Sequence, residues 1–256
     1  MDGDAKVVWV TPSGTGCDSR AISLDGTGQI YVLRSLSGDE GAISCDGDEL
    51  VGAGDPLGHF VASYSPSGDP ISTWRVTTPT SEPPLPQDYQ VNDILVLGSG
   101  TIILRAGSSV SLGETPPYAD DFEGLLAVKP DGKEKWWKLL DDADAVYPQV
   151  VIAGLLNDRL FTMVRDPYGD WGDQFAMAVF ESDGEVSRKS QRPKCYPHQH
   201  DGDDNSGDNG HAASNSKGQL ALAAVYEGAC SPLADMGGEE LPAHEPAGLF
   251  VAVVAP

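Results

Sequence analysis

The chain carries a hairpin pattern that recurs four times, and one copy is split between the two ends of the sequence. Each copy is a short apolar strand, a turn that contains Gly, and a second strand that bears a large side chain. Residues 248–256 match the first strand of the copy at 124–130, and residues 2–9 match its turn and second strand. A repeat that is complete only when the termini meet predicts a closed arrangement of repeats.

The second strand of each copy presents its large side chain on one face. Trp9 and Trp74 stand six residues after their turn Gly and Trp136 stands four after its own, and even offsets share one face of an alternating strand. The third copy lacks the aromatic residue and has Val186 and Arg188 at even offsets from its turn Gly. The copies run from Phe60 through Gly68 to Trp74, from Leu125 through Gly132 to Trp137, from Phe175 through Gly184 to Arg188, and from Leu249 through Gly3 to Trp9.

A second set of hairpins, at 21–33, 93–104, 150–163 and 212–225, alternates with the first set. Their turns contain Asp-Gly-Thr-Gly, Gly-Ser-Gly, Asn-Asp or Ser-Lys-Gly, which tolerate the positive φ of tight hairpin turns. Two hairpins per repeat predict an all-β fold, a β-propeller of four four-stranded blades whose ring is closed when the N-terminal strand pairs with the C-terminal strand. The alternative is a part of a larger propeller.

The prediction treats 1–256 as a single domain with repeat units at about 10–74, 75–138, 139–188 and 189–256 plus 1–10. The Pro-rich stretch 77–86 lies between strands of consecutive repeats and is interpreted as a loop, not a linker.

The segment from Phe60 to Trp74, with the Ser-Leu-Asp-Gly-Thr-Gly-Gln-Ile-Tyr-Val stretch at 23–32, resembles the repeats of bacterial secreted and surface proteins often called seven-bladed β-propeller repeats. It is similar, less closely, to quinoprotein-like repeats. In the quinoprotein pattern an Asp follows two residues after Ala and a Thr precedes the turn Gly. Here Lys129 follows Ala127 and Asp131 precedes Gly132, which argues against a pyrroloquinoline quinone enzyme.

The net charge of -23, with only 16 Lys and Arg, excludes nucleic acid as an expected partner. No apolar run is long enough to cross a bilayer, and the polar start Met1-Asp2-Gly3-Asp4 does not resemble a signal peptide. We expect a monomer that does not insert into membranes.

The predicted topology gathers all long connections on one face, here called the long-loop face, and leaves only tight turns on the other. The connections are 10–20, 37–58, 77–92, 106–123, 140–149, 166–173, 189–211 and 227–247. They hold most of the 39 Asp and Glu residues, so this face is the predicted binding face, although loops are commonly polar without binding anything. The candidate residues are Asp46, Asp48, Glu49, Asp120, Asp121, Asp166 and Asp170.

Four cysteines occupy corresponding places in the first and last repeats. Only the pairing Cys17–Cys45 with Cys195–Cys230 keeps each bond within its blade and on one face, which favours two structural disulfides. A secreted, periplasmic or cell-surface location follows from that pairing. Zinc binding by all four cysteines is the alternative.

The connection at 195–211 contains a candidate metal site. Oxygen side chains at 201, 203 and 205 resemble the start of a calcium loop, although Ser206 stands where such a loop has Gly. The His side chains could instead hold zinc or copper, and an unliganded solvated loop is the third interpretation. The residues are His198, His200, Asp201, Asp203, Asn205, Asp208 and His211.

The sequence contains no nucleophile elbow, zinc-protease or phosphate-loop motif, so no catalytic residue is assigned, and calcium is the leading candidate cofactor. His59 and His244 are interpreted as ordinary polar loop residues. The leading prediction is a non-enzymatic module that binds a protein, a glycan or a cation on the long-loop face. The alternatives are a carboxylate-based hydrolase or lyase at the propeller funnel and a metal-binding protein acting through 198–211.

Overall fold

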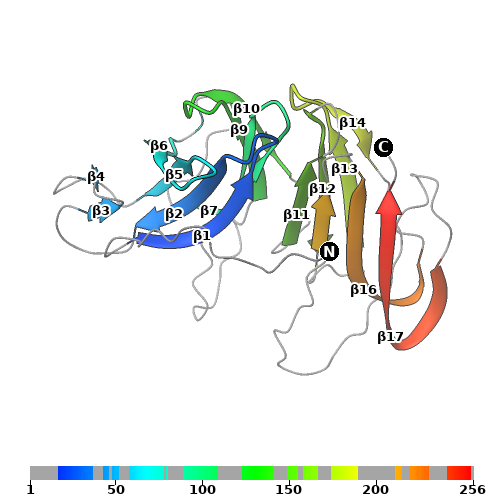
Figure 1. The fold of residues 1–256 in the computed structure, drawn as a ribbon. Coiled ribbons are helices and arrows are strands. Elements are labelled where there is room, and N and C mark those ends of the chain that lie inside the picture. The colour runs from blue at the N-terminus through cyan, green and yellow to red at the C-terminus, as the bar shows by residue number, and fades with distance from the viewer. Residues whose placement is uncertain are drawn as a thin grey trace.

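The structure is a computed structural model, and it describes residues 17–36, 43–45, 48–51, 58–77, 79, 89–108, 123–140, 149–154, 158–166, 174–189, 211–214, 219–230 and 241–254. Within these residues the regular structure is β-strand and no α-helix occurs (Figure 1). The described part of the chain likewise contains no helix long and apolar enough to cross a membrane.

Most strands belong to antiparallel sheets whose order follows the chain. Sheet 1 consists of β1 (Cys17–Leu24), β2 (Ile30–Leu36), β5 (His59–Tyr64) and β6 (Pro70–Arg75). Sheet 2 consists of β7 (Tyr89–Val96), β8 (Ile102–Ser108), β9 (Glu123–Val128) and β10 (Glu134–Leu139). Sheet 3 consists of β11 (Gln149–Gly154), β12 (Leu160–Asp166), β13 (Gln174–Phe180) and β14 (Val186–Lys189). Sheet 4 has, among the described residues, β15 (His211–Ser214), β16 (Leu220–Cys230) and β17 (Leu241–Val254).

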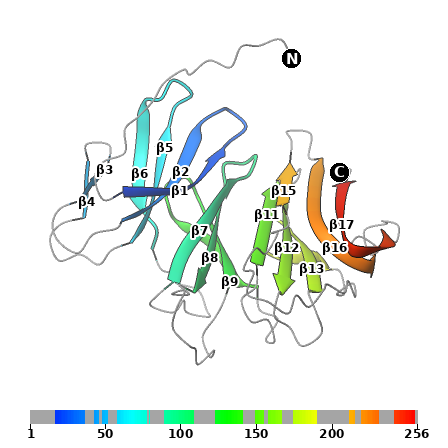
Figure 2. The ribbon, with the colours of Figure 1, turned by 90° about the horizontal axis from the view of Figure 1, so that it is seen from below.

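The sheets follow one another in space as they do in sequence, from sheet 1 on the left to sheet 4 on the right of Figure 2. The first strands of successive sheets are in contact, β1 with β7, β7 with β11 and β11 with β15. The predicted all-β class and the alternation of two kinds of hairpin are therefore confirmed. The described strands do not by themselves close a ring, and the predicted closing strand at 6–10 lies outside the described residues.

Two expected connections contain strands. Residues 37–58 include the hairpin of β3 (Ile43–Cys45) and β4 (Asp48–Val51), and much of 227–247 belongs to the extended ends of β16 and β17. In the latter, Gly228 pairs with His244 and Cys230 pairs with Leu241 across irregular register. Interpreting these residues as loops was wrong, because their backbone N–H and C=O groups pair with those of a neighbouring strand. The sequence alone does not indicate this pairing.

Five tight turns share one local design. The glycine in each has positive φ, from +82° to +91°, at Gly28, Gly68, Gly100, Gly132 and Gly184. An Asp or Ser at the turn accepts a backbone N–H two residues ahead, as Asp25 Oδ1 does from Thr27 at 2.8 Å and Asp183 Oδ1 from Glu185 at 3.0 Å. Asp158 adopts a φ of 57° at the Asn-Asp turn. The positive φ predicted for the turns at 25–28, 98–100 and 157–158 is confirmed.

Apolar cores lie between sheets 1 and 2 and between sheets 2 and 3, because alternate residues of each strand point to opposite faces. Ile102 and Leu104 of β8 pack with Leu33 and Val61 of sheet 1, whereas Ile103 between them packs with Leu160 of sheet 3. Trp74 joins the core between sheets 1 and 2, and Trp136 joins the core between sheets 2 and 3. Both indoles thus face the following sheet, and the prediction from their even offsets, that they share one face, is confirmed.

Candidate functional site

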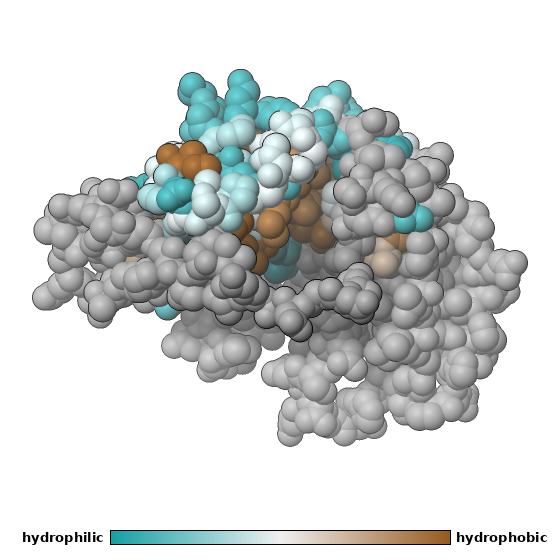
Figure 3. Space-filling model, viewed as in Figure 1, coloured by the Kyte–Doolittle hydropathy of each residue, from teal (hydrophilic) through white to brown (hydrophobic). Residues whose placement is uncertain are grey.

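The antiparallel topology separates two ends of the sheets. The tight turns at 25–29, 65–69, 97–101, 129–133 and 181–185 join strands at the end here called the tight-turn face. The strand ends from which the long connections leave lie at the opposite end, on the long-loop face. In Figure 3 hydrophilic residues cover the upper edge of the molecule, and hydrophobic residues are visible in a hollow in the middle of the view.

Carboxylates on the tight-turn face are engaged by their own turns. Asp131 is exposed, and its pKa is lowered first by the hydrogen bond from the Lys133 side chain and then by the Lys133 backbone N–H. Asp25 accepts three hydrogen bonds within its turn, from Thr27 N, Thr27 Oγ1 and Gln29 N. These side chains stabilise the hairpins, which favours the other face as the place for binding.

A polar group lies between sheets 1 and 2 in the half of sheet 1 nearer the long-loop face. A bulge between Ser19 and Ala21 sets Arg20 apart from the ladder, and Arg20 Nε donates to Ser35 Oγ at 2.9 Å. His59 Nε2 accepts the backbone N–H of Val91 in β7 at 3.2 Å. Burial and, second, the Arg20 charge lower the pKa of His59 to about 4. His59 is therefore neutral at neutral pH, and the exposed Arg20 supplies the positive charge of this group.

A second polar group lies midway along β7 and β8. Asp93 is paired in register with Arg105, and Asp93 Oδ1 accepts the N–H of Ile94 at 2.8 Å. Burial raises the pKa of Asp93, while the Ile94 hydrogen bond and the Arg105 charge act in the opposite direction. A carboxyl group that takes up a proton more readily than usual is suited to proton donation.

A buried arginine joins β2 to β5 in sheet 1 through a side-chain hydrogen bond. Arg34, only 4% exposed, donates from Nη2 to the Tyr64 hydroxyl at 2.7 Å, and its guanidinium carbon lies 5.9 Å from the centre of the Tyr64 ring. Both side chains point to the face of sheet 1 that is turned away from sheet 2, since the intervening Leu33 and Val61 belong to the core between those sheets. We assign this pair a structural role.

Few of the predicted site residues are described by the structure. Asp48 and Glu49 lie in β4, Asp166 is the last residue of β12, and His211 is the first residue of β15. The remaining candidates, Asp46, Asp120, Asp121, Asp170, His198, His200, Asp201, Asp203, Asn205 and Asp208, lie outside the described residues. Within the described part of the chain, no group of three or more His, Cys, Asp or Glu side chains could hold a metal ion. The metal site and the acidic binding residues therefore stay predictions.

The cysteine pairing also stays a prediction. Cys17 is the buried first residue of β1, Cys45 is the last residue of β3, and these two strands are in contact. Cys230 is the last residue of β16, and Cys195 lies outside the described residues.

The sequence analysis missed the polar group around His59. His59 begins β5 and His244 lies within β17, so interpreting them as loop residues was wrong. A signal was present for His59, because it directly precedes the apolar strand at 60–64 and so stands at a strand end. Its contact with Val91 joins residues far apart in the chain and had no such signal.

No family model matches the chain, and no curated protein matches it. Solved structures do. A Hadza microbial sialidase is 12% identical with a TM-score of 0.50, over 91% of this chain and 47% of that chain. Inulosucrase from Halalkalicoccus jeotgali is 15% identical with a TM-score of 0.38, over 86% of this chain and 61% of that chain. A luciferin-regenerating enzyme is 12% identical with a TM-score of 0.41, over 95% of this chain and 77% of that chain.

At these identities the sialidase match shows similarity of fold alone. The chain spans about half the length of that sialidase, since 47% of the sialidase is covered.

Proposed function

We propose that this chain is a glycan-binding module built on a four-bladed β-propeller scaffold, with the long-loop face as its binding surface. The observation that carries the proposal is the separation of connections: all five described tight turns lie at one end of the sheets, and the long connections leave from the other. Loops of variable length on a rigid scaffold are where binding residues commonly lie. The similarity in fold to a protein titled as a sialidase favours a glycan over a protein or a cation.

The described residues near this face carry groups that suit sugar hydroxyls and carboxyls. Arg20 is exposed and its guanidinium is oriented by the hydrogen bond to Ser35, so donors that Ser35 does not use can meet a ligand. Asp18 is exposed on the same strand and offers carboxylate oxygens as acceptors. A cationic donor and an anionic acceptor on one strand can bind a polar ligand in a defined orientation.

The test is capture of glycans by the full chain and by charge-reversed variants. Arg20→Glu and Asp18→Lys change the long-loop face, and Lys133→Glu and Asp131→Lys are matched controls on exposed residues of the tight-turn face. We expect binding to a panel of immobilised sialylated and neutral glycans to weaken about tenfold or more in the first pair, as for a lost charged hydrogen bond, and to persist in the controls. Absence of capture by the unmodified chain, or equal losses in both pairs, would refute the proposal.

A hydrolase is the second candidate, and the raised pKa of Asp93 favours it. Burial promotes the protonated form of this carboxyl group, as general acid catalysis requires. Turnover of glycans and esters should then fall at least a hundredfold in Asp93→Asn and be retained in Asp183→Asn, whose side chain can still accept the Glu185 N–H. The same assay with Asp120→Asn, Asp121→Asn, Asp166→Asn and Asp170→Asn tests the acids predicted from sequence. A chain that turns over none of these substrates is not such a hydrolase.

A further inference from the structure

A polar row lies between sheets 2 and 3 where the corresponding row between sheets 1 and 2 is apolar. Each polar residue stands at the register position of an apolar one, counted from the last pair of its hairpin: Asp93 at that of Ala21, Arg105 at that of Leu33 and Thr162 at that of Leu104. The three apolar residues lie in or against the core between sheets 1 and 2. The repeat therefore buries apolar side chains at one interface and places polar side chains at the next.

Strand alternation turns the polar side chains of both sheets toward their shared interface. Asp93 and Arg105 are cross-strand partners, and Ile94 beside Asp93 faces sheet 1, so the two polar side chains face sheet 3. Thr162 follows Leu160 by two residues in β12, and Leu160 lies in the core between sheets 2 and 3. Thr162 therefore faces sheet 2.

The hydroxyl group of Thr162 is buried without a partner. Thr162 is 0% exposed, and its Oγ1 has no hydrogen-bond partner among the described residues. Comparable buried hydroxyl groups are paired, since Ser23 Oγ accepts the Val96 N–H at 2.9 Å. Likewise, Thr101 Oγ1 accepts from Lys135 Nζ at 2.8 Å. A buried hydroxyl group without a partner lowers stability, and a ligand that forms a hydrogen bond with it would recover the loss.

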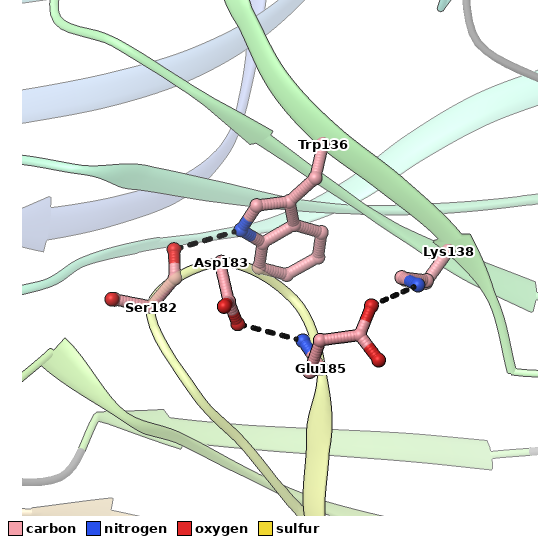
Figure 4. Close-up of polar contacts among 5 residues, drawn as sticks. All are labelled: Trp136, Lys138, Ser182, Asp183 and Glu185. Carbon is pink, nitrogen blue, oxygen red and sulfur yellow. Dashed lines mark hydrogen bonds and ion pairs between the residues drawn. The ribbon is translucent and has the colours of Figure 1, made fainter.

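Sheets 2 and 3 are joined at the tight-turn face. The described hydrogen bonds between them end on turn residues of sheet 3: from Trp136 to Ser182 at 3.1 Å and from Lys138 to Glu185 at 3.3 Å (Figure 4), and from Ser99 to Asp158 at 2.7 Å. Between sheets 1 and 2, by contrast, the bond from Val91 to His59 lies in the half nearer the long-loop face. The tight-turn end of the interface between sheets 2 and 3 can therefore serve as a hinge when its long-loop end separates.

We propose that the long-loop half of the interface between sheets 2 and 3 binds hydroxyl groups of a neutral sugar through Asp93, Arg105 and Thr162. The inference rests on the proposed function and names the class of glycan. Arg105 offsets the charge of Asp93, so a charged group of a ligand would find no counter-charge in this row. The chain's net charge of -23 also disfavours an anionic ligand.

The three side chains match the two roles of a sugar hydroxyl group. Asp93 Oδ1 accepts the Ile94 N–H, which leaves Oδ2 to accept from a ligand, and Arg105 carries only donors. Both side chains are half-buried and can be reached from solvent. The Thr162 hydroxyl can donate or accept, and a ligand reaches it when the long-loop end of the interface separates. Binding thus gives the buried hydroxyl group its partner.

Substitution of Thr162 tests the site in the full chain. Thr162→Val keeps the shape of the side chain and removes the unpaired hydroxyl group, so without sugar the melting temperature should rise by about 2–10 °C. The dissociation constant for methyl glycosides of neutral hexoses, measured by calorimetry, should rise about three- to tenfold, as for one lost neutral hydrogen bond. Thr162→Ser keeps the hydroxyl group and should bind more tightly than Thr162→Val.

Two further variants serve as control and second test. Thr101→Val removes a buried hydroxyl group that is paired, so it should lower the melting temperature and leave sugar binding unchanged. The triple variant Asp93→Ala, Arg105→Leu and Thr162→Leu reproduces the apolar row between sheets 1 and 2. It should fold at an equal or higher melting temperature and lose sugar binding, because apolar residues that replace buried charges are commonly tolerated.

The inference fails if Thr162→Val lowers the melting temperature, since the hydroxyl group would then be paired in the folded chain. An unchanged dissociation constant for neutral sugars in Thr162→Val and in the triple variant would also overturn it. Equal weakening of N-acetylneuraminic acid and neutral sugars would refute the neutral class. Glycan capture that Arg20→Glu weakens and Thr162→Val leaves unchanged would refute this inference alone, whereas absence of capture by the unmodified chain refutes the proposed function.

Discussion

Replacing Gly184 with Ala tests how much the contact between the Trp136 indole and the Gly184 backbone contributes to the stability of the fold. The φ of +85° at Gly184 costs an L-residue roughly 1–2 kcal/mol. The new Cβ atom would also lie 2.7 Å from Trp136 Cδ2, so the ring must move. When the ring moves, it loses the hydrogen bond to the Ser182 carbonyl, which is worth about 1 kcal/mol. It also loses its stacking on Phe180, whose ring centre lies 6.4 Å away, and this contact is worth about 1 kcal/mol. The total is about 3–4 kcal/mol of unfolding free energy, or roughly 6–16 °C in melting temperature.

Gly100→Ala is the matched control for this change. Gly100 has a φ of +83°, but a Cβ atom there would meet its nearest neighbour, Pro130 Cγ, at the ordinary distance of 3.6 Å. The control should therefore lose only the backbone term of about 1–2 kcal/mol. Urea unfolding followed by tryptophan fluorescence measures both variants, with unchanged m-values as the check on comparability. Equal losses in the two variants would show that Trp136 adjusts at no cost, and the reasoning would fail.

The remaining predictions concern three polar contacts and the cysteines. His59 has a pKa of about 4 in the folded chain against 6.5 in the unfolded chain, so its contribution to the free energy of unfolding is complete above pH 6.5 and is lost as pH falls toward 4. Because solvent reaches part of the ring, we expect this loss to be about 1–2 kcal/mol. The loss should be absent in His59→Gln when the free energy of unfolding is measured across the same pH range. Tyr64→Phe removes the hydroxyl that accepts from Nη2 of the buried Arg34 and should cost about 1.5–3 kcal/mol in urea unfolding, whereas a loss below 0.5 kcal/mol, on the order of a surface contact, would contradict the assigned role. Lys138→Ala breaks an exposed ion pair with Glu185 and should change stability by less than about 0.5 kcal/mol. Peptide mapping under non-reducing conditions should yield Cys17 linked to Cys45 and Cys195 linked to Cys230, and any other linkage would show the pairing to be wrong.

Local features of this fold could be predicted from the sequence because their causes lie within a few residues. The Gly, Asp and Ser residues at the turns determine positive φ and the capping hydrogen bonds, and alternation along the strands determines which residues face together. On these grounds the hairpins, the glycine at 132 and the common face of Trp74 and Trp136 could all be predicted.

Contacts between sheets could not be predicted in this way. The half-buried His59 with its lowered pKa depends on Val91 and Arg20, and the extended pairing of β16 with β17 depends on two segments meeting in an irregular register. Which glycine each indole covers is likewise set by the neighbouring sheet, since the turns at 65–69, 129–133 and 181–185 are locally the same. The sequence by itself determined the repeated hairpins and their turns, through backbone conformation and alternation. Only the tertiary structure decided the burial, charge state and partner of each side chain, because desolvation and packing arise when sheets distant in sequence come together.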